Sequence, residues 1–468
     1  MKFIKEICLR LWHSPTYTTW GNFIVSASSL LVTMPLLLRK FNPDVTAVWF
    51  LFTTIITFVH IADLGFTPTF TRLTAFVMGG ATDLRDFRDI RNKGDGKVKW
   101  DVMEKLYGNI GYVYIISTLL VFVCAITFGT LILSKPISKV HNQPEMWQAW
   151  SVTIIGLSIN FYGKKYEALL QGMNYIALVN RINIIFGFLG VIVSFIILLN
   201  NGTILQLAIA TQVFSILISV RGWLILRQVE NGRFRKFKLF SFNKEIFEAA
   251  WAPSWRSAIV ILGSTGVTQA SGFMFAQVGD LKILASYLFA LKLMNTISDI
   301  SKAPFYTKTP VFSKLRSEGK LFELTEQTSR AIFISLTIFF IGAICVLFCP
   351  YFLRLVSSKV VFINPKLWIL MVVVWALERH HAMHAQIYST TNHVPFYVPI
   401  IISGIVNLLL AMLLLPKIGI WAFPIAQGVS NALMNNWWNV KISLKSLNQT
   451  FSSYYKIMFV QFKIKKSA

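Results

Sequence analysis

Long apolar runs dominate the pattern of residues along the chain. Stretches of about 20 largely apolar residues recur from end to end, with short polar connections between them. A helix of about 20 residues crosses a hydrocarbon core roughly 30 Å thick, so the pattern predicts an all-α polytopic membrane protein. We expect twelve spans, at residues 18–38, 46–66, 106–133, 148–170, 176–199, 203–226, 250–277, 281–303, 331–349, 367–388, 394–415 and 418–440.

The amino-acid composition is typical of a protein with transmembrane spans and not of a soluble globular protein. Of the 468 residues, 55% are hydrophobic and 14% are charged, whereas soluble globular chains carry about 25% charged residues. The cysteines show no paired C-x-x-C spacing, which argues against a zinc site and against a disulfide framework. They are Cys8, Cys124, Cys345 and Cys349.

The basic residues predict the orientation of the spans. Of the 45 Lys and Arg residues, 32 fall on the side shared by both termini and nine on the other side. Because basic loops are retained in the cytoplasm, we expect both termini to be cytoplasmic. The net charge of +25 then reflects topology and contact with anionic lipids. Short, separate basic loops do not favour a nucleic-acid partner.

A weak internal repeat divides the chain into two halves. Segment 63–72, which closes the second span, recurs at 299–308 with acid, proline, threonine and base in the same order. We therefore expect two pseudo-symmetric six-helix lobes around a central cavity, at 18–226 and 250–440. The remaining parts are an interfacial N-terminal helix at 1–17, a basic linker at 227–249 and a basic cytoplasmic tail at 441–468.

The first span carries a polar stripe. Asn22, Ser26, Ser29 and Thr33 are spaced i, i+4, i+7 and i+11, which places them on one helical face. Three of the four corresponding positions in the seventh span are also polar. Such stripes are typical of repeats that face a wet cavity, although small polar residues also pack membrane helices against each other.

Four basic residues lie inside the predicted spans and outside the loop counts. A charge at bilayer depth costs at least about 2.5–3.5 kcal/mol, so it usually faces a cavity or a partner. Lys292 shares a helical face with Asn295 and Asp299, which is hard to reconcile with lipid. The alternatives are structural ion pairs or side chains that reach the interface. The four residues are Arg221, Arg256, Lys292 and Arg379.

These residues provide candidates for a transport site. We expect an anionic substrate to be bound by cationic and amide or hydroxyl groups of Arg256, Lys292, Arg379, Asn22, Ser26 and Asn295. Gating or proton coupling is assigned to Asp63, Glu378, Asp299 and His381, with helix capping or pairing as the alternative for the two aspartates. His380 and His384 are spaced i, i+4, but no third ligand is evident, so no metal site is expected. The sequence indicates no cofactor and no catalytic residue.

The run Ala62-Asp63-Leu64-Gly65-Phe66, the twelve spans and the short basic loops together resemble O-antigen flippases of the Wzx type. These belong to the polysaccharide transporter family of the multidrug/oligosaccharidyl-lipid/polysaccharide (MOP) superfamily. The resemblance implies a bacterial inner-membrane protein that is not an enzyme, with a MOP- or MATE-like pair of lobes. It also implies ion-coupled alternating access and a substrate of undecaprenyl diphosphate carrying one sugar repeat unit. Membrane lipids, a polysaccharide polymerase and a chain-length regulator are the implied partners.

Three other functions compete with this interpretation. A multidrug or cation antiporter of the same superfamily would normally have an acid-rich cavity, and the intramembrane cations argue against it. A polytopic glycosyltransferase or polymerase is expected to have a sizeable periplasmic loop, which the predicted loops do not provide. A lipid II flippase would typically be longer by two spans.

Overall fold

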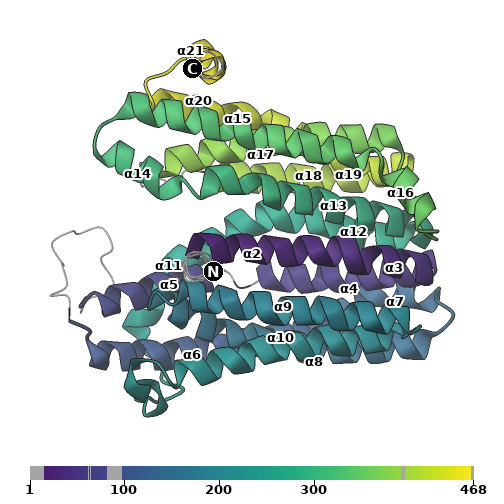
Figure 1. The fold of residues 1–468 in the computed structure, drawn as a ribbon, viewed down its shortest axis with the longest axis horizontal. Coiled ribbons are helices and arrows are strands. Elements are labelled where there is room, and N and C mark those ends of the chain that lie inside the picture. The colour runs from purple at the N-terminus through teal and green to yellow at the C-terminus, as the bar shows by residue number, and fades with distance from the viewer. Residues whose placement is uncertain (1–14, 62, 64, 82–96, 392–395, 465–468) are drawn as a thin grey trace, which may run out of the picture. The chain divides into compact units, whose positions relative to one another are not determined.

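The computed structural model describes residues 15–61, 63, 65–81, 97–391 and 396–464. The predicted interfacial helix at 1–17 lies almost entirely outside this range. Regular structure within it is helical, without a strand, and the chain divides into two compact units, Met1–Leu262 and Gly263–Ala468. In each unit the long helices lie side by side with their axes roughly aligned (Figure 1).

The N-terminal unit is built around α8 (Gln143–Gly172), which packs against α10, α5, α6 and α4. A π-helical turn at Ser29–Thr33 joins α2 to α3, and a second one at Ala125–Gly129 joins α6 to α7. The other helices of this unit are α2 (Pro15–Ser28), α3 (Met34–Lys40), α4 (Pro43–Ile61), α5 (Phe66–Met78), α6 (Trp100–Cys124), α7 (Thr130–Ser138), α9 (Ile176–Leu199), α10 (Ile204–Leu226) and α11 (Lys244–Ile261).

The C-terminal unit packs α13 against α15 and α17 against α20. Its last helix, α21, is anchored on α15 by Tyr454, whose fully buried hydroxyl bonds Thr328 Oγ1 over 3.1 Å. The helices are α12 (Val267–Val278), α13 (Leu281–Tyr306), α14 (Thr309–Ser317), α15 (Leu321–Val346), α16 (Cys349–Leu355), α17 (Pro365–Ser389), α18 (Tyr397–Ile418), α19 (Ala422–Leu433), α20 (Asn435–Ser446) and α21 (Phe451–Ile464).

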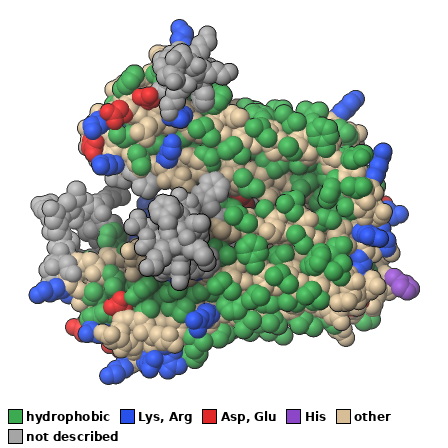
Figure 2. All heavy atoms as spheres, viewed as in Figure 1, with side chains coloured by type: hydrophobic (Ala, Val, Ile, Leu, Met, Phe, Trp, Pro, Cys, Tyr) green, Lys and Arg blue, Asp and Glu red, His purple; other side chains and the backbone are tan. Residues whose placement is uncertain are grey.

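Every predicted span falls on one of these helices or on a consecutive pair of them. Seven stretches of the described chain are long and apolar enough by themselves to cross a membrane. Large apolar side chains cover the middle of the helices on the face seen in Figure 2, whereas Lys and Arg gather towards their ends. The predicted class, an all-α polytopic membrane protein, is confirmed. The twelfth span is divided into α19 and α20 at Met434.

The lead helices of the two halves share one irregularity. The π-helical turn in the first span lies at Ser29–Thr33, and a second π-helical turn at Leu262–Gly266 joins α11 to α12 in the seventh span. When the two halves of the internal repeat are aligned, these two π-helical turns fall at nearly the same position. Such turns interrupt the regular hydrogen-bond ladder and often mark functional sites. Positions 257 and 264 belong to the corresponding polar stripe of the seventh span, and their side chains lie outside the part of the chain that the structure describes.

The linker between the halves is docked along α6. Ser241 donates its backbone N–H to Gly108 O over 3.2 Å, and Asn109 Nδ2 donates to Asn243 O over 2.8 Å. A Cβ at Gly111 would lie 2.0 Å from Leu239 O. The α6 glycines are therefore needed because the linker backbone lies where side chains would project. The predicted domain boundaries remain a prediction, although α11 groups with the N-terminal unit.

We expect Gly111→Ala to destabilise the N-terminal unit. The new methyl group collides with the linker backbone, and overpacking of this kind typically costs about 1–3 kcal/mol. Thermal unfolding of the detergent-purified chain should show a midpoint lowered by roughly 2–4 °C per kcal/mol. Gly190→Ala is the matched control, because its Cβ would make an ordinary 3.4 Å contact with Phe214. Equal midpoints for both variants would contradict the docking of the linker.

Candidate functional site

Asp63 and Gly65 form the turn that separates α4 from α5. Gly65 has a φ of 69°, in the left-handed region that glycine adopts without a steric penalty. Asp63 Oδ2 accepts a 3.0 Å hydrogen bond from the backbone N–H of Thr67, which caps the new helix. The motif that closes the second span is thus a helix stop and restart. Residues 62 and 64 lie outside the described range.

Asp63 also belongs to a buried charge cluster with two residues of α8. Lys164 interacts electrostatically with both Asp63 and Glu167, and Glu167 Oε1 accepts a 2.8 Å hydrogen bond from Gln171. Asp63 is 7% exposed, and its Oδ1 has no hydrogen-bond partner in the described part of the chain. Two carboxyl groups therefore share one ammonium group, which leaves an acid in excess.

The sequence contained a signal for this cluster that the span assignment missed. Lys164 and Lys165 lie inside the predicted span 148–170, but they are not among the four basic residues assigned to span interiors. The structure places them within α8. A Lys-Lys-x-Glu segment ending in Glu167 inside an apolar span is itself evidence of a buried ion cluster, because isolated charges at that depth are costly.

Lys165 has a different environment from its neighbour. Its side chain is 1% exposed, and its ammonium lies 3.6 Å from the ring centroid of Tyr162, 4.9 Å from that of Tyr166 and 5.9 Å from that of Phe240. It also donates to the Tyr162 hydroxyl. Aromatic faces stabilise a desolvated cation through the ring quadrupole. Phe240 belongs to the linker, so Lys165 connects α8 to the linker.

Arg379 points into the C-terminal unit and joins three of its helices. The side chain is 5% exposed. Its guanidinium donates to Ser298 O of α13 and to Ser335 Oγ of α15, each over 2.8 Å. These partners are a backbone carbonyl and a hydroxyl, so the arrangement is neither the ion pair nor the interface-reaching side chain considered from the sequence, and the substrate role of Arg379 remains a prediction. In this structure Arg379 holds helices together instead of presenting a free charge.

Lys292 lies on the partly exposed side of α13. Asn295 is also partly exposed and Asp299 is exposed, whereas the opposite side of the helix, with Leu291 and Met294, is buried. The predicted shared face therefore exists on the helix. Asp299 itself forms an exposed ion pair with Lys302 over 2.9 Å, which is the pairing alternative considered for this acid.

The other predicted substrate ligands divide into exposed and bonded groups. Arg256 is exposed, with its guanidinium 5.7 Å from the ring of Trp255. Ser26 is exposed and donates to the backbone oxygen of Asn22. Asn22 Nδ2 donates over 3.1 Å to Asn180 Oδ1 of α9. Asn22 therefore joins α2 to α9, as the helix-packing alternative for the polar stripe expects.

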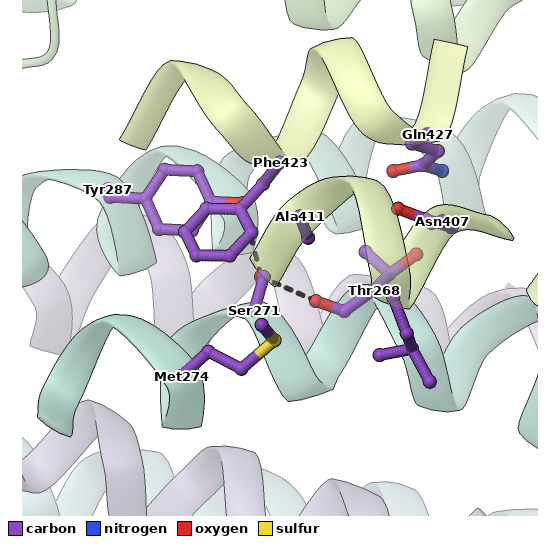
Figure 3. A pocket seen from close by; sticks show the side chains of 9 residues that line it. Thr268, Ser271, Met274, Tyr287, Asn407, Ala411, Phe423 and Gln427 are labelled. Carbon is purple, nitrogen blue, oxygen red and sulfur yellow. Dashed lines mark hydrogen bonds between the residues drawn. The ribbon is translucent and has the colours of Figure 1, made fainter. Parts of the chain in front are cut away.

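Glu378 is held in the interior of the C-terminal unit by Gln427, whose amide donates to the carboxylate. Figure 3 shows Gln427 and Asn407 at one end of a small pocket, with the stacked rings of Tyr287 and Phe423 at the other. The pocket volume is about 10 Å³, which is close to the minimum for one water molecule. It is too small for a sugar or an organic cation.

The three histidines of α17 each bond a group on α20 or α21. His381 Nδ1 lies 2.8 Å from Asn436 Oδ1, and His384 Nδ1 lies 3.2 Å from Ser443 Oγ. His380 Nε2 bonds the hydroxyl of Tyr455 on the tail helix. Nowhere in the described ranges do three or more His, Cys, Asp or Glu side chains gather closely enough to hold a metal ion. The gating role of His381 remains a prediction.

Solved structures with the same arrangement of helices are transporters. The lipid II flippase MurJ in an inward closed conformation aligns with a TM-score of 0.67 and 12% identity, covering 94% of this chain and 89% of that chain. An inward-facing multidrug resistance MATE family transporter of the MOP superfamily gives 0.63 and 13%, covering 93% and 95%. A MOP superfamily transporter from Pyrococcus furiosus, described by the reverse polarity of its binding pocket, gives 0.51 and 14%, covering 94% and 98%.

No protein-family model and no curated protein matches the sequence. The likeness to these solved structures shows that the chain has the all-α fold found in multi-pass transporters. More particularly, its fold is the one seen in MOP superfamily structures. Because identities of 12–14% show likeness of fold alone, and because one fold hosts many functions, the activity has to be argued from the site.

We expect Arg379→Lys to lower the stability of the C-terminal unit. A lysine ammonium lacks the planar fork that reaches two acceptors at once, and a buried acceptor left unpaired costs about 1–3 kcal/mol. The thermal unfolding midpoint of the purified chain should fall. Arg354→Lys, at an exposed position of α16, should leave it unchanged. An unaltered midpoint in Arg379→Lys, combined with loss of transport, would instead identify Arg379 as a substrate ligand.

Proposed function

We propose that this protein is a flippase that moves undecaprenyl-diphosphate-linked sugar repeat units from the cytoplasmic to the periplasmic leaflet of a bacterial inner membrane. The observation that carries the proposal is Lys292, a cation in the middle of α13 on the partly exposed side of that helix. A positive charge on a partly exposed face in the middle of a predicted span suits the binding of an anionic substrate group. A diphosphate supplies one.

The supporting chemistry combines a charged head with an apolar tail. Asn295 lies one turn after Lys292 on the same face of α13, so an ammonium and an amide are available to a phosphorylated sugar. A charge-assisted hydrogen bond of this kind is about twice as strong as a neutral one. The prenyl chain needs no protein cavity, because it can stay in the lipid while the head crosses. Transport then requires alternating access of the protein to the two sides of the membrane, and no covalent bond is made or broken.

The polarity of the partly exposed groups favours this function over drug export. Arg256 is exposed and Lys292 is partly exposed, and both would repel an organic cation. The Pyrococcus furiosus structure is described as having a pocket of reverse polarity that suggests a different function, so pocket polarity separates members of this fold. A cation antiporter would need its acids at the substrate, whereas Asp63 and Glu378 are bonded inside their units.

The Asp63–Lys164–Glu167 cluster is suited to couple transport to an ion. One ammonium cannot neutralise two carboxylates, so the cluster takes up a proton or a small cation to reach neutrality inside the membrane. Asp63 caps the first turn of α5. A change in its charge would therefore act directly on the turn between α4 and α5, which gives ion binding a mechanical consequence.

We expect Lys292→Ala to abolish export of surface polysaccharide while leaving membrane insertion intact, and Lys292→Arg to retain it in part. The reason is that the alanine variant loses the charge and the arginine variant keeps it. Immunoblots of surface polysaccharide in a flippase-deleted host, with membrane levels of the protein measured in parallel, provide the test. Lys282→Ala, at an exposed position near the start of the same helix, is the control. Normal export by Lys292→Ala would remove this residue from the mechanism.

Asp63→Asn and Glu167→Gln should uncouple transport from the ion gradient. Each change removes the excess negative charge of the cluster at almost constant volume, so uptake of a proton is no longer required. In proteoliposomes loaded with a lipid-linked oligosaccharide, the wild-type rate should respond to an imposed proton or sodium gradient and the variant rates should not. Asp101→Asn, exposed in the first turn of α6, should behave as wild type. Gradient-driven rates in both cluster variants would contradict the coupling role.

A further inference from the structure

A pocket of about 340 Å³ lies inside the N-terminal unit, between the last turns of α8, the first turns of α9 and the last turns of α10. Its volume falls within the roughly 300–1,000 Å³ typical of small-molecule sites. The pocket lies at the ends of these helices that meet the 173–175 connection and the linker, which are predicted to be cytoplasmic. It is thus separate from Lys292, which belongs to the other unit.

One wall of the pocket presents fixed polar groups. Asn160 Nδ2 donates to Ser215 O over 3.1 Å and to Ser219 Oγ over 3.4 Å, which leaves its Oδ1 to accept from a ligand. Asn183 of α9 also lines the pocket, and its amide has no hydrogen-bond partner within the described ranges. Asn183 is partly exposed, so its amide is accessible to a ligand in the pocket and can both donate and accept.

The charges at the pocket specify a neutral ligand. Lys164 and Glu167 both line it, and Asp63 interacts with Lys164 from behind. An anion would meet an excess of carboxylate, and an organic cation would meet the ammonium. An alkyl chain would leave the amides and the charged groups without partners. A neutral polyhydroxylated molecule satisfies all of them, because each hydroxyl both donates and accepts.

The same helices also supply apolar lining residues. Val179 and Ile182 of α9 and Leu170 and Tyr166 of α8 border the pocket. A pyranose has a C–H face as well as hydroxyl edges, so it matches a pocket lined by both apolar and polar side chains. We propose that this pocket binds a neutral pyranose. Gly163 and Gly222 also line it, and because a Cβ at Gly163 would lie 2.2 Å from Ser219 Oγ, this part of the lining depends on the close packing of α8 against α10.

Assigning the pyranose to the repeat unit of a transported lipid rests on the proposed flippase function, whereas the pocket's affinity for free sugar does not. Because the pocket is predicted to lie on the cytoplasmic side, it would bind one sugar of the repeat unit before the phosphorylated head group crosses the membrane. Glu167 would then connect sugar binding to the charge cluster, because it lines the pocket and interacts with Lys164.

The test uses the full-length chain in lipid nanodiscs with the native cysteines replaced by serine and a single cysteine introduced as Asn183→Cys. A charged methanethiosulfonate should label this thiol, because a pocket of about 340 Å³ lined by charged and amide groups has room for water and for the reagent. Free neutral sugars such as glucose, galactose, rhamnose and N-acetylglucosamine, at concentrations suited to affinities of about 1 mM or weaker, are then tested for protection. At least one should slow labelling about tenfold, which corresponds to near-saturation of the pocket. Gluconate and inorganic phosphate should not.

Two matched variants complete the experiment. Ile185→Cys lies two positions along α9 on an exposed apolar face, so its slow labelling should not respond to any sugar. Glu167→Gln, added to Asn183→Cys, should raise the protecting sugar concentration about fivefold to tenfold, because a charged acceptor becomes a neutral one. The glutamine is nearly isosteric, and an unchanged unfolding midpoint would show that the fold is kept.

Protection by no neutral sugar would overturn the proposal, as would equal protection by gluconate or phosphate, or protection unaffected by Glu167→Gln. These results are distinct from failure of the proposed function. If Lys292→Ala exports normally but sugars still protect Asn183→Cys, the flippase mechanism falls and the sugar site stands. If export depends on Lys292 but no sugar protects, only the sugar site falls.

Discussion

The energetic cost of placing a charge in hydrocarbon is the constraint on which the rest of this structure depends. Most charged residues lie near helix ends, and the few at depth have specific surroundings. Arg379 bonds a backbone carbonyl and a serine hydroxyl of two other helices, whereas Lys165 lies against aromatic rings. Lys292, by contrast, occupies a partly exposed face of α13.

Two adjacent lysines of α8 contact different parts of the N-terminal unit. Adjacent residues of an α-helix point about 100° apart, so Lys164 reaches the acids of the cluster while Lys165 reaches the aromatic side chains and the linker residue Phe240. The linker in turn packs on the glycines of α6. The interior of the N-terminal unit is therefore in contact with the segment that leads to the second half.

The two lead helices add a second structural element to this picture. Each contains a π-helical turn near its middle, where an extra residue weakens the regular ladder of hydrogen bonds. In the first helix this turn falls on Ser29 and Thr33 of the polar stripe, and Thr33 Oγ1 bonds Ser29 O over 2.6 Å. The hydroxyls therefore help to satisfy backbone groups within an interrupted helix. Their polarity has a local structural reason in addition to any contact with a substrate.

The sequence by itself determined the spans, because burial in lipid requires about 20 apolar residues whatever the neighbours are. It also located the stop after the second span and some of the charges inside the spans, among them Lys292 and Arg379, but not the Lys164–Glu167 group. Only the tertiary structure decided which charges are sealed and which are partly exposed. Arg379 and Lys292 look alike in the sequence, but Arg379 is buried against Ser298 and Ser335, whereas Lys292 lies on a partly exposed face. The cluster of Asp63 with Lys164 joins residues about 100 positions apart in the sequence, and the pocket beside Asn183 joins residues as much as about 60 positions apart. Local periodicity carries no information about such contacts, because they depend on how helices pack against each other.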